Sequence, residues 1–299
     1  MSDASSLVLA CLPDRKRAVV LDLVEALQQV EGVLAIVLGG SYARGTQRSE
    51  SDVDIGLYYD PARPFAVDTI RTIAAVVSTA AAPTVTDYYQ WGAWVNGGAW
   101  LYTASGKIDL LYRNLDQVLR TIEAAQGGAW EHDYDQQPTH GFYSVIYLAE
   151  TADCRPLHDP DRRIAALKRS VAEYPQALQQ RIVADSLWAA EFTIYHARAF
   201  ASNGDVYNTV GCLTRIAACL TQCLFAINKR YFAGDKSVPS ALPSFDLLPS
   251  DYVDRIDRSL SRPGRSVGEL IDAVAEIIRL WSDVADLPGV TYASKLAIR

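Results

Sequence analysis

The stretch VLAIVLGGSYARGTQRSESDVDIGLYY, residues 33–59, decides the fold of the first half of the chain. Its first six residues are apolar and rich in β-branched side chains, which is typical of a buried strand. Gly39, Gly40 and Ser41 end that strand, and we expect a short helix to start there. Residues 53–59 predict a second strand. Two strands therefore frame a polar loop.

The turn after the first strand has the composition of an anion-binding loop. Backbone amides at such a turn, with a helix N-terminus behind them, form a cradle for an anion. Gly40 would let the backbone approach a phosphate, and the Ser41 hydroxyl can donate a hydrogen bond to it. Arg44 and Arg48 follow in the loop. They would neutralise a bound triphosphate, or they are solvated loop charges or partners for Glu50.

Asp52 and Asp54 flank Val53 at the start of the second strand. Because side chains alternate along a strand, both carboxylates share one face while Val53 points into the core. Two adjacent carboxylates repel, and a divalent cation would relieve that repulsion. Magnesium prefers carboxylates, phosphate oxygens and water. Ser51 either caps the turn before Asp52 or contacts the phosphate or metal shell.

A third acid, Asp109, lies in the apolar segment KIDLLY, residues 107–112. An acid inside an apolar strand is unfavourable unless it is paired or bound to a metal. If this strand neighbours the strand of Asp52 and Asp54, the three carboxylates converge on one site.

The rest of the chain changes character near residue 159. Before that point helices and strands are mixed, and after it the apolar periodicity is almost wholly helical. We therefore predict an α/β domain over residues 1–159 and an all-α helical bundle over residues 160–299. The further predicted segments are helices over 14–30, 66–82, 116–125, 164–172, 177–202, 207–231 and 267–284, and strands over 91–103, 107–112 and 142–148.

The composition sets limits on partners. The chain has 299 residues, 28 basic and 35 acidic side chains, and a net charge of -7. Such an acidic chain has no broad electrostatic affinity for nucleic acid or anionic membranes. The longest apolar runs, such as residues 33–38 and 217–227, are shorter than the ~20 residues that cross a bilayer. The N-terminus lacks a signal-peptide pattern. We expect a cytoplasmic protein, and the oligomeric state stays open.

One pattern in this sequence resembles that of the polymerase-β-like nucleotidyltransferase superfamily. It consists of Gly40-Ser41, ten further residues, Asp52-Val53-Asp54 and a later lone Asp109. The two-part organisation is also similar, more loosely, to the aminoglycoside nucleotidyltransferases. The resemblance implies an α/β (α+β) domain with a short mixed sheet and flanking helices, followed by helices. It further implies two Mg²⁺ ions, an NTP, and transfer of the NMP to an acceptor.

The same resemblance implies roles for individual residues. Asp52 and Asp54 would hold both metals, and Asp109 would bind the catalytic one and help to deprotonate the acceptor. Gly40 and Ser41 would bind the β- and γ-phosphates. A lysine of the helical domain would reach the triphosphate.

That lysine is not identified by the sequence. Lys229 and Lys236 are the candidates, and the alternative is that they are solvated charges at a helix end.

Three functions remain open on this basis. The first is NMP transfer to a hydroxyl of a small molecule, for example an aminoglycoside-like cation, which would suit the acidic first half of the chain. The second is transfer to a protein or tRNA acceptor, as in toxin-like relatives. The third is a non-catalytic module that only binds a nucleotide. The complete set of three aspartates favours an enzyme, but the sequence identifies neither the NTP nor the acceptor.

Overall fold

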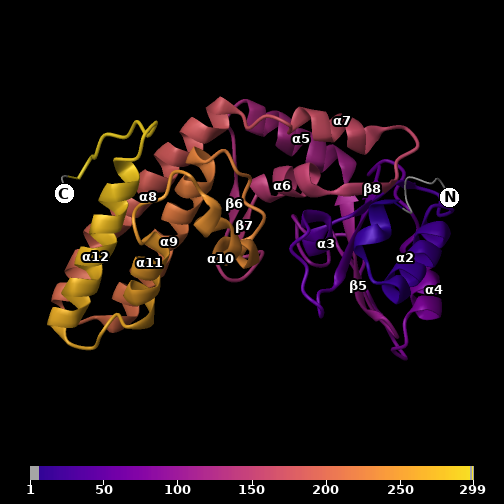
Figure 1. Cartoon of the computed structure of the whole chain (residues 1–299), viewed down its shortest axis with the longest axis horizontal. Helices are drawn as coiled ribbons and strands as arrows, with labels where there is room; N and C mark the ends of the chain where they lie inside the picture. Colours follow the sequence, from indigo (N-terminus) through magenta and orange to yellow (C-terminus); the bar gives the residue numbers. More distant parts are fainter. Residues whose placement is uncertain (1–6, 297, 299) are drawn as a thin grey trace. The chain divides into compact units, whose positions relative to one another are not determined.

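The structure is a computed structural model that describes residues 7–296 and 298 (Figure 1). The chain divides into two compact units, and each unit is built from several separate stretches of the sequence. Within the described residues, the first unit comprises residues up to 123, 133–136 and 146–173, and the second comprises 124–132, 137–145 and 174 onward. These units describe packing, and the domain boundary at residues 159 and 160 stays a prediction.

A mixed sheet of six strands forms the centre of the first unit. The strands are β1 (Val33–Leu38), β2 (Val53–Tyr59), β3 (Thr84–Val85), β4 (Gly98–Thr103), β5 (Gly106–Asn114) and β8 (Arg155–His158). Their order is β3-β4-β5-β2-β1-β8. Only the β2–β5 pair is parallel among the described neighbours, and the other pairs are antiparallel. This confirms the short mixed sheet that the resemblance implies.

Helices flank this sheet and cover its apolar side chains. They are the 3₁₀ turn η1 (Leu9–Cys11) and the helices α2 (Asp14–Leu27), α3 (Gly40–Arg44), α4 (Val67–Val77), α5 (Leu115–Gln126), α6 (Val145–Asp153) and α7 (Arg163–Ser170). Helices α2 and α4 pack against each other, as Figure 1 shows. Leu23 and Leu27 of α2 and Ile70 of α4 are fully buried in the same core as the strands. Each such side chain stabilises the fold by about 1.5–3 kcal/mol.

Two of the predicted strands differ from the structure. The strand expected over residues 91–103 starts only at Gly98, because Asn96 and Gly97 have positive φ angles and turn the chain before it. The strand expected over 142–148 is wrong beyond Tyr143, since helix α6 starts at Val145. A short apolar run fits a buried helix as well as a buried strand. Helix α6 carries two acidic residues near its C-terminal end, Glu150 and Asp153.

The second unit is helical. Its elements are α8 (Gln176–Ser202), α9 (Val206–Ile227), α10 (Val238–Ala241), α11 (Tyr252–Ser261), α12 (Val267–Ala285), and the 3₁₀ turns η2 (Asp235–Ser237) and η3 (Leu242–Ser244). Helices α8, α9 and α12 pack together. Trp281 of α12 is fully buried, and its indole N–H donates to the Leu187 carbonyl of α8 at 3.1 Å. The predicted succession of a mixed α/β region and a helical region is confirmed. A separate two-stranded sheet pairs β6 (His132–Asp133) with β7 (Phe142–Tyr143).

Helix α9 is long and apolar enough to cross a membrane when judged by length and composition alone. About half of its most apolar window, 56%, is buried inside the protein. Leu213, Ile216 and Leu220 are fully buried, as expected for the central helix of a bundle. The apolarity of α9 is therefore explained by packing within the second unit.

Candidate active site

The register of two parallel strands places Asp54 directly opposite Asp109. In the β2–β5 ladder, Val53 pairs with Ile108 and Asp54 pairs with Asp109. Val53 and Ile108 are buried at 0% and 2% exposure, so they anchor this end of both strands in the core. Since neighbouring strands lie about 4.8 Å apart, the two carboxylates occupy one small region of the sheet face. The condition named for convergence, that these two strands are neighbours, is therefore met.

Lys107 lies between the carboxylates of Asp52 and Asp109. Its Nζ atom is 3.1 Å from Asp52 Oδ2 and 2.8 Å from Asp109 Oδ2. Lys107 precedes Asp109 by two residues on β5, and strand alternation places both side chains on the same face. Asp52 and Asp109 therefore share a single ammonium group, and Asp54 lies opposite Asp109 in the strand register. Partial burial lowers the pKa of Lys107, but its hydrogen bonds to the two aspartates outweigh this and raise it.

The glycine turn fits against Asp54. The Gly39 amide donates to the Asp54 carbonyl at 2.8 Å. Gly40 has a φ of 59°, and a Cβ atom there would lie 1.7 Å from Asp54 Oδ2. Only glycine fits this position without moving Asp54, because of both the backbone angle and the contact. The backbone at residue 40 thus lies directly beside the carboxylate.

The polar loop that follows is attached to helix α2. Tyr42 of α3 is buried, and its hydroxyl accepts a hydrogen bond from Lys16 Nζ at 3.2 Å. The same ammonium donates to the Ser51 carbonyl at 2.7 Å. The Ser51 hydroxyl accepts from the Arg48 amide at 2.8 Å, so Ser51 does cap the turn before Asp52. Ser41 is half-buried, at the start of α3.

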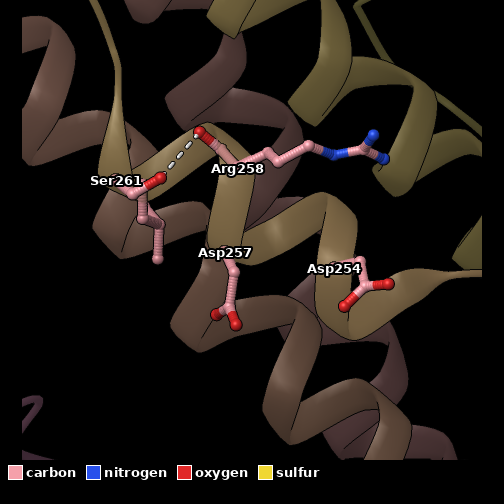
Figure 2. Close-up of a pocket in the computed structure, with 5 residues that line it drawn as sticks. Asp254, Asp257, Arg258 and Ser261 are labelled. Atoms are coloured by element: carbon pink, nitrogen blue, oxygen red, sulfur yellow. Dashed lines mark hydrogen bonds between the residues drawn. The ribbon is translucent and has the colours of Figure 1, made fainter.

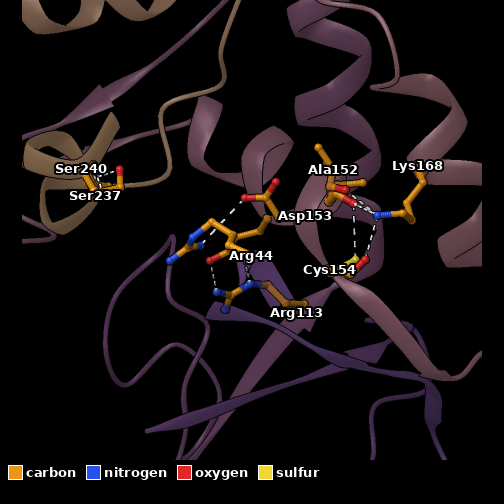
Figure 3. A network of polar contacts seen from close by, with 11 residues as sticks. Arg44, Arg113, Ala152, Asp153, Cys154, Lys168, Ser237 and Ser240 are labelled. Carbon is orange, nitrogen blue, oxygen red and sulfur yellow. Dashed lines mark hydrogen bonds and ion pairs between the residues drawn. The ribbon is translucent and has the colours of Figure 1, made fainter. Parts of the chain in front are cut away.

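Arg44 and helix α6 bring further charges into the first unit (Figure 3). Arg44 Nη1 lies 3.9 Å from Asp153 Oδ2. Arg113 of β5 is buried and donates two hydrogen bonds, of 2.8 and 2.7 Å, to the two carboxylate oxygens of Glu150. This bidentate pair holds Glu150 in one orientation.

The C-terminal end of α6 is held in place by a lysine. Lys168 Nζ donates to the main-chain oxygens of Thr151, Ala152 and Cys154 at 3.3, 2.5 and 2.7 Å. Figure 3 shows this ammonium against Ala152 and Cys154. Carbonyl groups at a helix end lack partners within the helix, and a cation there satisfies them.

Electrostatic repulsion accumulates on Asp54. Burial is the largest cause that raises the pKa of Asp54, to about 6, followed by the negative charges of Asp109 and Glu150. Arg44 lowers the pKa of Asp54, but by less. Strongly shifted carboxyl groups of this kind are concentrated at functional sites. The site therefore has a surplus of negative charge that a bound cation would relieve.

The donor set suits a hard divalent cation chemically. Carboxylate oxygens are the ligands that Mg²⁺ prefers, and the Gly40 backbone leaves the Asp54 carboxylate room. As the described residues stand, however, no group of three or more His, Cys, Asp or Glu side chains is already arranged to hold a metal ion. Lys107, which contacts two of the three carboxylates, shares the site with them.

Three residues near the site were missed by the sequence analysis as members of it. Lys107 could have been found, because a lysine two positions from Asp109 on a strand must share its face. Arg113 and Glu150 could not, since Glu150 belongs to a helix whose first residues, 145–148, were predicted as strand, and the two are 37 positions apart.

Two further candidates are lysines of the helical region. Lys229, just after α9, and Lys236, in η2, belong to the second unit, and their role toward a triphosphate stays a prediction. Figure 2 shows a surface hollow of that unit, along α11. Asp254, Asp257, Arg258 and Ser261 line it. It contains none of the predicted site residues.

Two family models match parts of the chain. Residues 20–97 match a family model described as a nucleotidyltransferase domain, and residues 144–236 match one described as a domain of unknown function, DUF4037. The first match includes Gly40, Ser41, Asp52 and Asp54 but ends before Asp109. The chain is also similar to the crystal structure of a nucleotidyltransferase-like protein from Exiguobacterium sibiricum, with 9% identity and a TM-score of 0.45, over 90% of this chain and 74% of that one. No curated protein matches the sequence.

Proposed function

We propose that the chain, which carries a nucleotidyltransferase domain of the polymerase-β-like superfamily, transfers a nucleoside monophosphate from an NTP to a hydroxyl group of a small acceptor. The bond between the α- and β-phosphates breaks, and pyrophosphate leaves. The observation that carries this proposal is the alignment of Asp54 with Asp109 across two parallel strands, with Asp52 joined to Asp109 through Lys107. Acids from two strands that meet beside a glycine turn form a compact site for a nucleotide and its cation.

Asp52, Asp54 and Asp109 are proposed as the residues that hold Mg²⁺, two ions in all. When bound, Mg²⁺ would neutralise phosphate charge and stabilise the attacking and leaving oxygens of an in-line displacement. The protein's own task is then mainly to position the groups and exclude alternatives, as is usual in phosphoryl-type transfer.

The loop residues are proposed to bind the triphosphate. Gly40 brings the backbone close to the carboxylates, and the Ser41 hydroxyl donates a hydrogen bond to a phosphate oxygen. Arg44 would exchange its long 3.9 Å contact with Asp153 for a phosphate oxygen, since a charge-assisted bond to phosphate is shorter and stronger. Asp109 is proposed to accept the proton of the acceptor hydroxyl. Ser51 and one lysine of the helical region, Lys229 or Lys236, are proposed as further triphosphate contacts.

The acidic residues favour a cationic acceptor. Five carboxylates, those of Asp52, Asp54, Asp109, Glu150 and Asp153, outnumber the three cations that pair with them, Lys107, Arg113 and Arg44. A small cation, such as an aminoglycoside-like amine, would be attracted by this charge, whereas a tRNA backbone would be repelled. A protein or tRNA acceptor is therefore the second candidate.

The proposal is tested by label transfer. The protein is incubated with Mg²⁺, each α-labelled NTP and a panel of amino-sugars, with protein and tRNA as competing acceptors. Label on an amino-sugar, lost in Asp54→Asn, is the expected result. Label on protein or tRNA would replace the small acceptor by the macromolecular one. NTP binding that survives Asp54→Ala, without turnover by the parent, would favour a non-catalytic module.

A further inference from the structure

Lys107 occupies the position between Asp52 and Asp109 that a cation would be expected to fill. We propose that Lys107 is an exchangeable internal counter-ion, which holds these two carboxylates together in the metal-free protein and leaves them when a divalent cation binds. The inference rests on the proposed function for its metal, but it concerns a residue that the nucleotidyltransferase pattern at residues 40–54 does not include.

The contact distances show that Lys107 and a metal ion would use the same carboxylate oxygens. Lys107 Nζ lies 3.1 Å from Asp52 Oδ2 and 2.8 Å from Asp109 Oδ2, both within hydrogen-bonding distance. A magnesium ion binds carboxylate oxygens directly at about 2.0–2.1 Å. An ammonium group on the same two oxygens would then lie close to a doubly charged ion, and the two cations repel. Lys107 and the metal therefore compete for Asp52 and Asp109.

The surroundings of Lys107 allow its ammonium group to leave the two carboxylates. The side chain is one-quarter exposed, so it can turn toward solvent without rearranging the strand. Lys107 Nζ also lies 5.6 Å from the centre of the Trp100 ring. Trp100, on the neighbouring strand β4, lies opposite Asp109 of β5 and is 41% exposed. A tryptophan face attracts a cation, so the ammonium can keep its contact with Trp100 when it leaves the two carboxylates.

The competing explanation is a permanent structural ion pair. In that case Lys107 would stay on both carboxylates whether or not Mg²⁺ is present. The two explanations differ in the accessibility of one amine, which can be measured without any substrate or turnover.

The first experiment measures the acylation of lysine amines in the full-length protein, by mass spectrometry, with and without saturating Mg²⁺. Lys107 is expected to become about threefold more reactive with Mg²⁺, the size expected for the loss of partly exposed ion pairs. Lys168 is the internal control, because its ammonium donates to main-chain oxygens only in the contacts described above.

The second experiment measures the Mg²⁺ dissociation constant by calorimetry for two variants. Lys107→Met removes the competing charge and is expected to bind Mg²⁺ about three- to tenfold more tightly. Lys107→Arg keeps the charge and is expected to stay near the parent. If Lys107→Met does not fold, the acylation of the parent protein decides alone.

The outcomes separate this inference from the proposed function. Mg²⁺ binding with unchanged or reduced Lys107 reactivity would overturn the exchange, while leaving the metal site intact. Weaker Mg²⁺ binding by a folded Lys107→Met would also overturn it. A parent protein that does not bind Mg²⁺ at all would overturn both the metal role of the aspartates and the exchange.

Discussion

A Cβ atom on residue 40 would lie 1.7 Å from Asp54 Oδ2. Any residue other than glycine at position 40 would therefore displace either the turn or the Asp54 carboxylate. The glycine turn and the acidic strand are thus parts of one contact. The tight fit explains why a glycine and an acid 14 positions apart belong to the same site.

Gly40→Ala is expected to lower the free energy of unfolding by about 2–4 kcal/mol and to abolish turnover, because it adds a steric clash to an unfavourable positive φ. Gly45→Ala is the matched control, since Gly45 also has a positive φ, of 73°, but a Cβ there would meet nothing within 4 Å. That control should lose only about 1–2 kcal/mol. Denaturant unfolding compares the two, and equal losses would show that the contact with Asp54 is unimportant.

Asp54→Asn is expected to stabilise the metal-free protein while it removes activity. The pKa of Asp54 is raised to about 6 from an ordinary 3.8, so ionisation of Asp54 opposes folding. The penalty develops as the pH rises from about 4 to about 6 and is complete above that. Asp54→Asn should therefore be about 1–3 kcal/mol more stable at pH 8 and no more stable at pH 3.

Urea unfolding at several pH values measures this difference. Saturating Mg²⁺ should shrink the difference at pH 8, since it stabilises only the protein that binds it. A parent protein as stable as Asp54→Asn at pH 8 without metal would contradict the repulsion described for this site.

Glu150→Ala is expected to lower the free energy of unfolding by about 2–4 kcal/mol, because it leaves the buried Arg113 guanidinium without its bidentate partner. Asp87→Ala is the control. Asp87 pairs with Arg71 at 2.6 Å, but both side chains are well exposed, and such pairs contribute about 0–1 kcal/mol. The double variant Arg113→Met/Glu150→Met should recover part of the loss. Thermal and denaturant unfolding measure all three, and similar losses at both sites would refute the role of burial.

Glu191 of α8 is expected to make the C-terminal segment sensitive to acid. This fully buried carboxylate accepts hydrogen bonds from the Tyr292 and Ser294 hydroxyls and from the amides of Lys295 and Leu296. Burial raises its pKa, but these hydrogen bonds outweigh burial and hold the pKa below its ordinary 4.5. The stabilisation is therefore complete above about pH 4.5 and is lost as the pH falls through the lowered value.

Glu191→Gln should cost about 1–3 kcal/mol at pH 7, because the amide cannot accept all four bonds. Asp272→Asn, an exposed carboxylate on α12, is the control. Limited proteolysis should cut the segment at residues 292–296 faster in Glu191→Gln only. Equal cutting of both variants would mean that Glu191 does not hold this segment.

Local patterns predicted much of the site because its main residues lie close together in the chain. The buried strand before Gly39, the turn at Gly40 and the alternation around Val53 each follow from spacing within a few residues. These patterns correctly placed the Asp54 carboxylate opposite to the buried Val53. The turn-capping role of Ser51 was one of two alternatives, and the hydrogen bond to Arg48 shows it directly.

Sequence patterns did not identify the secondary structure where the same residues suit both a strand and a helix. The run 142–148 is apolar on every side, so periodicity could not distinguish a strand from a helix. The choice depends on tertiary contacts, such as the Tyr147 hydroxyl that donates to the Trp94 carbonyl at 2.5 Å. The position of Glu150 beside Arg113 depended on that choice.

By itself, the sequence determined which residues could carry the chemistry, namely a glycine turn, two acids on one strand face and a third acid in an apolar strand. It did so because strand alternation and backbone freedom are local properties. Only the tertiary structure decided that Asp109 pairs with Asp54, that Lys107 bridges Asp52 and Asp109, and that Arg113 orients Glu150. These relationships depend on which strands become neighbours and on how a helix packs against them, and burial of the whole core selects that arrangement.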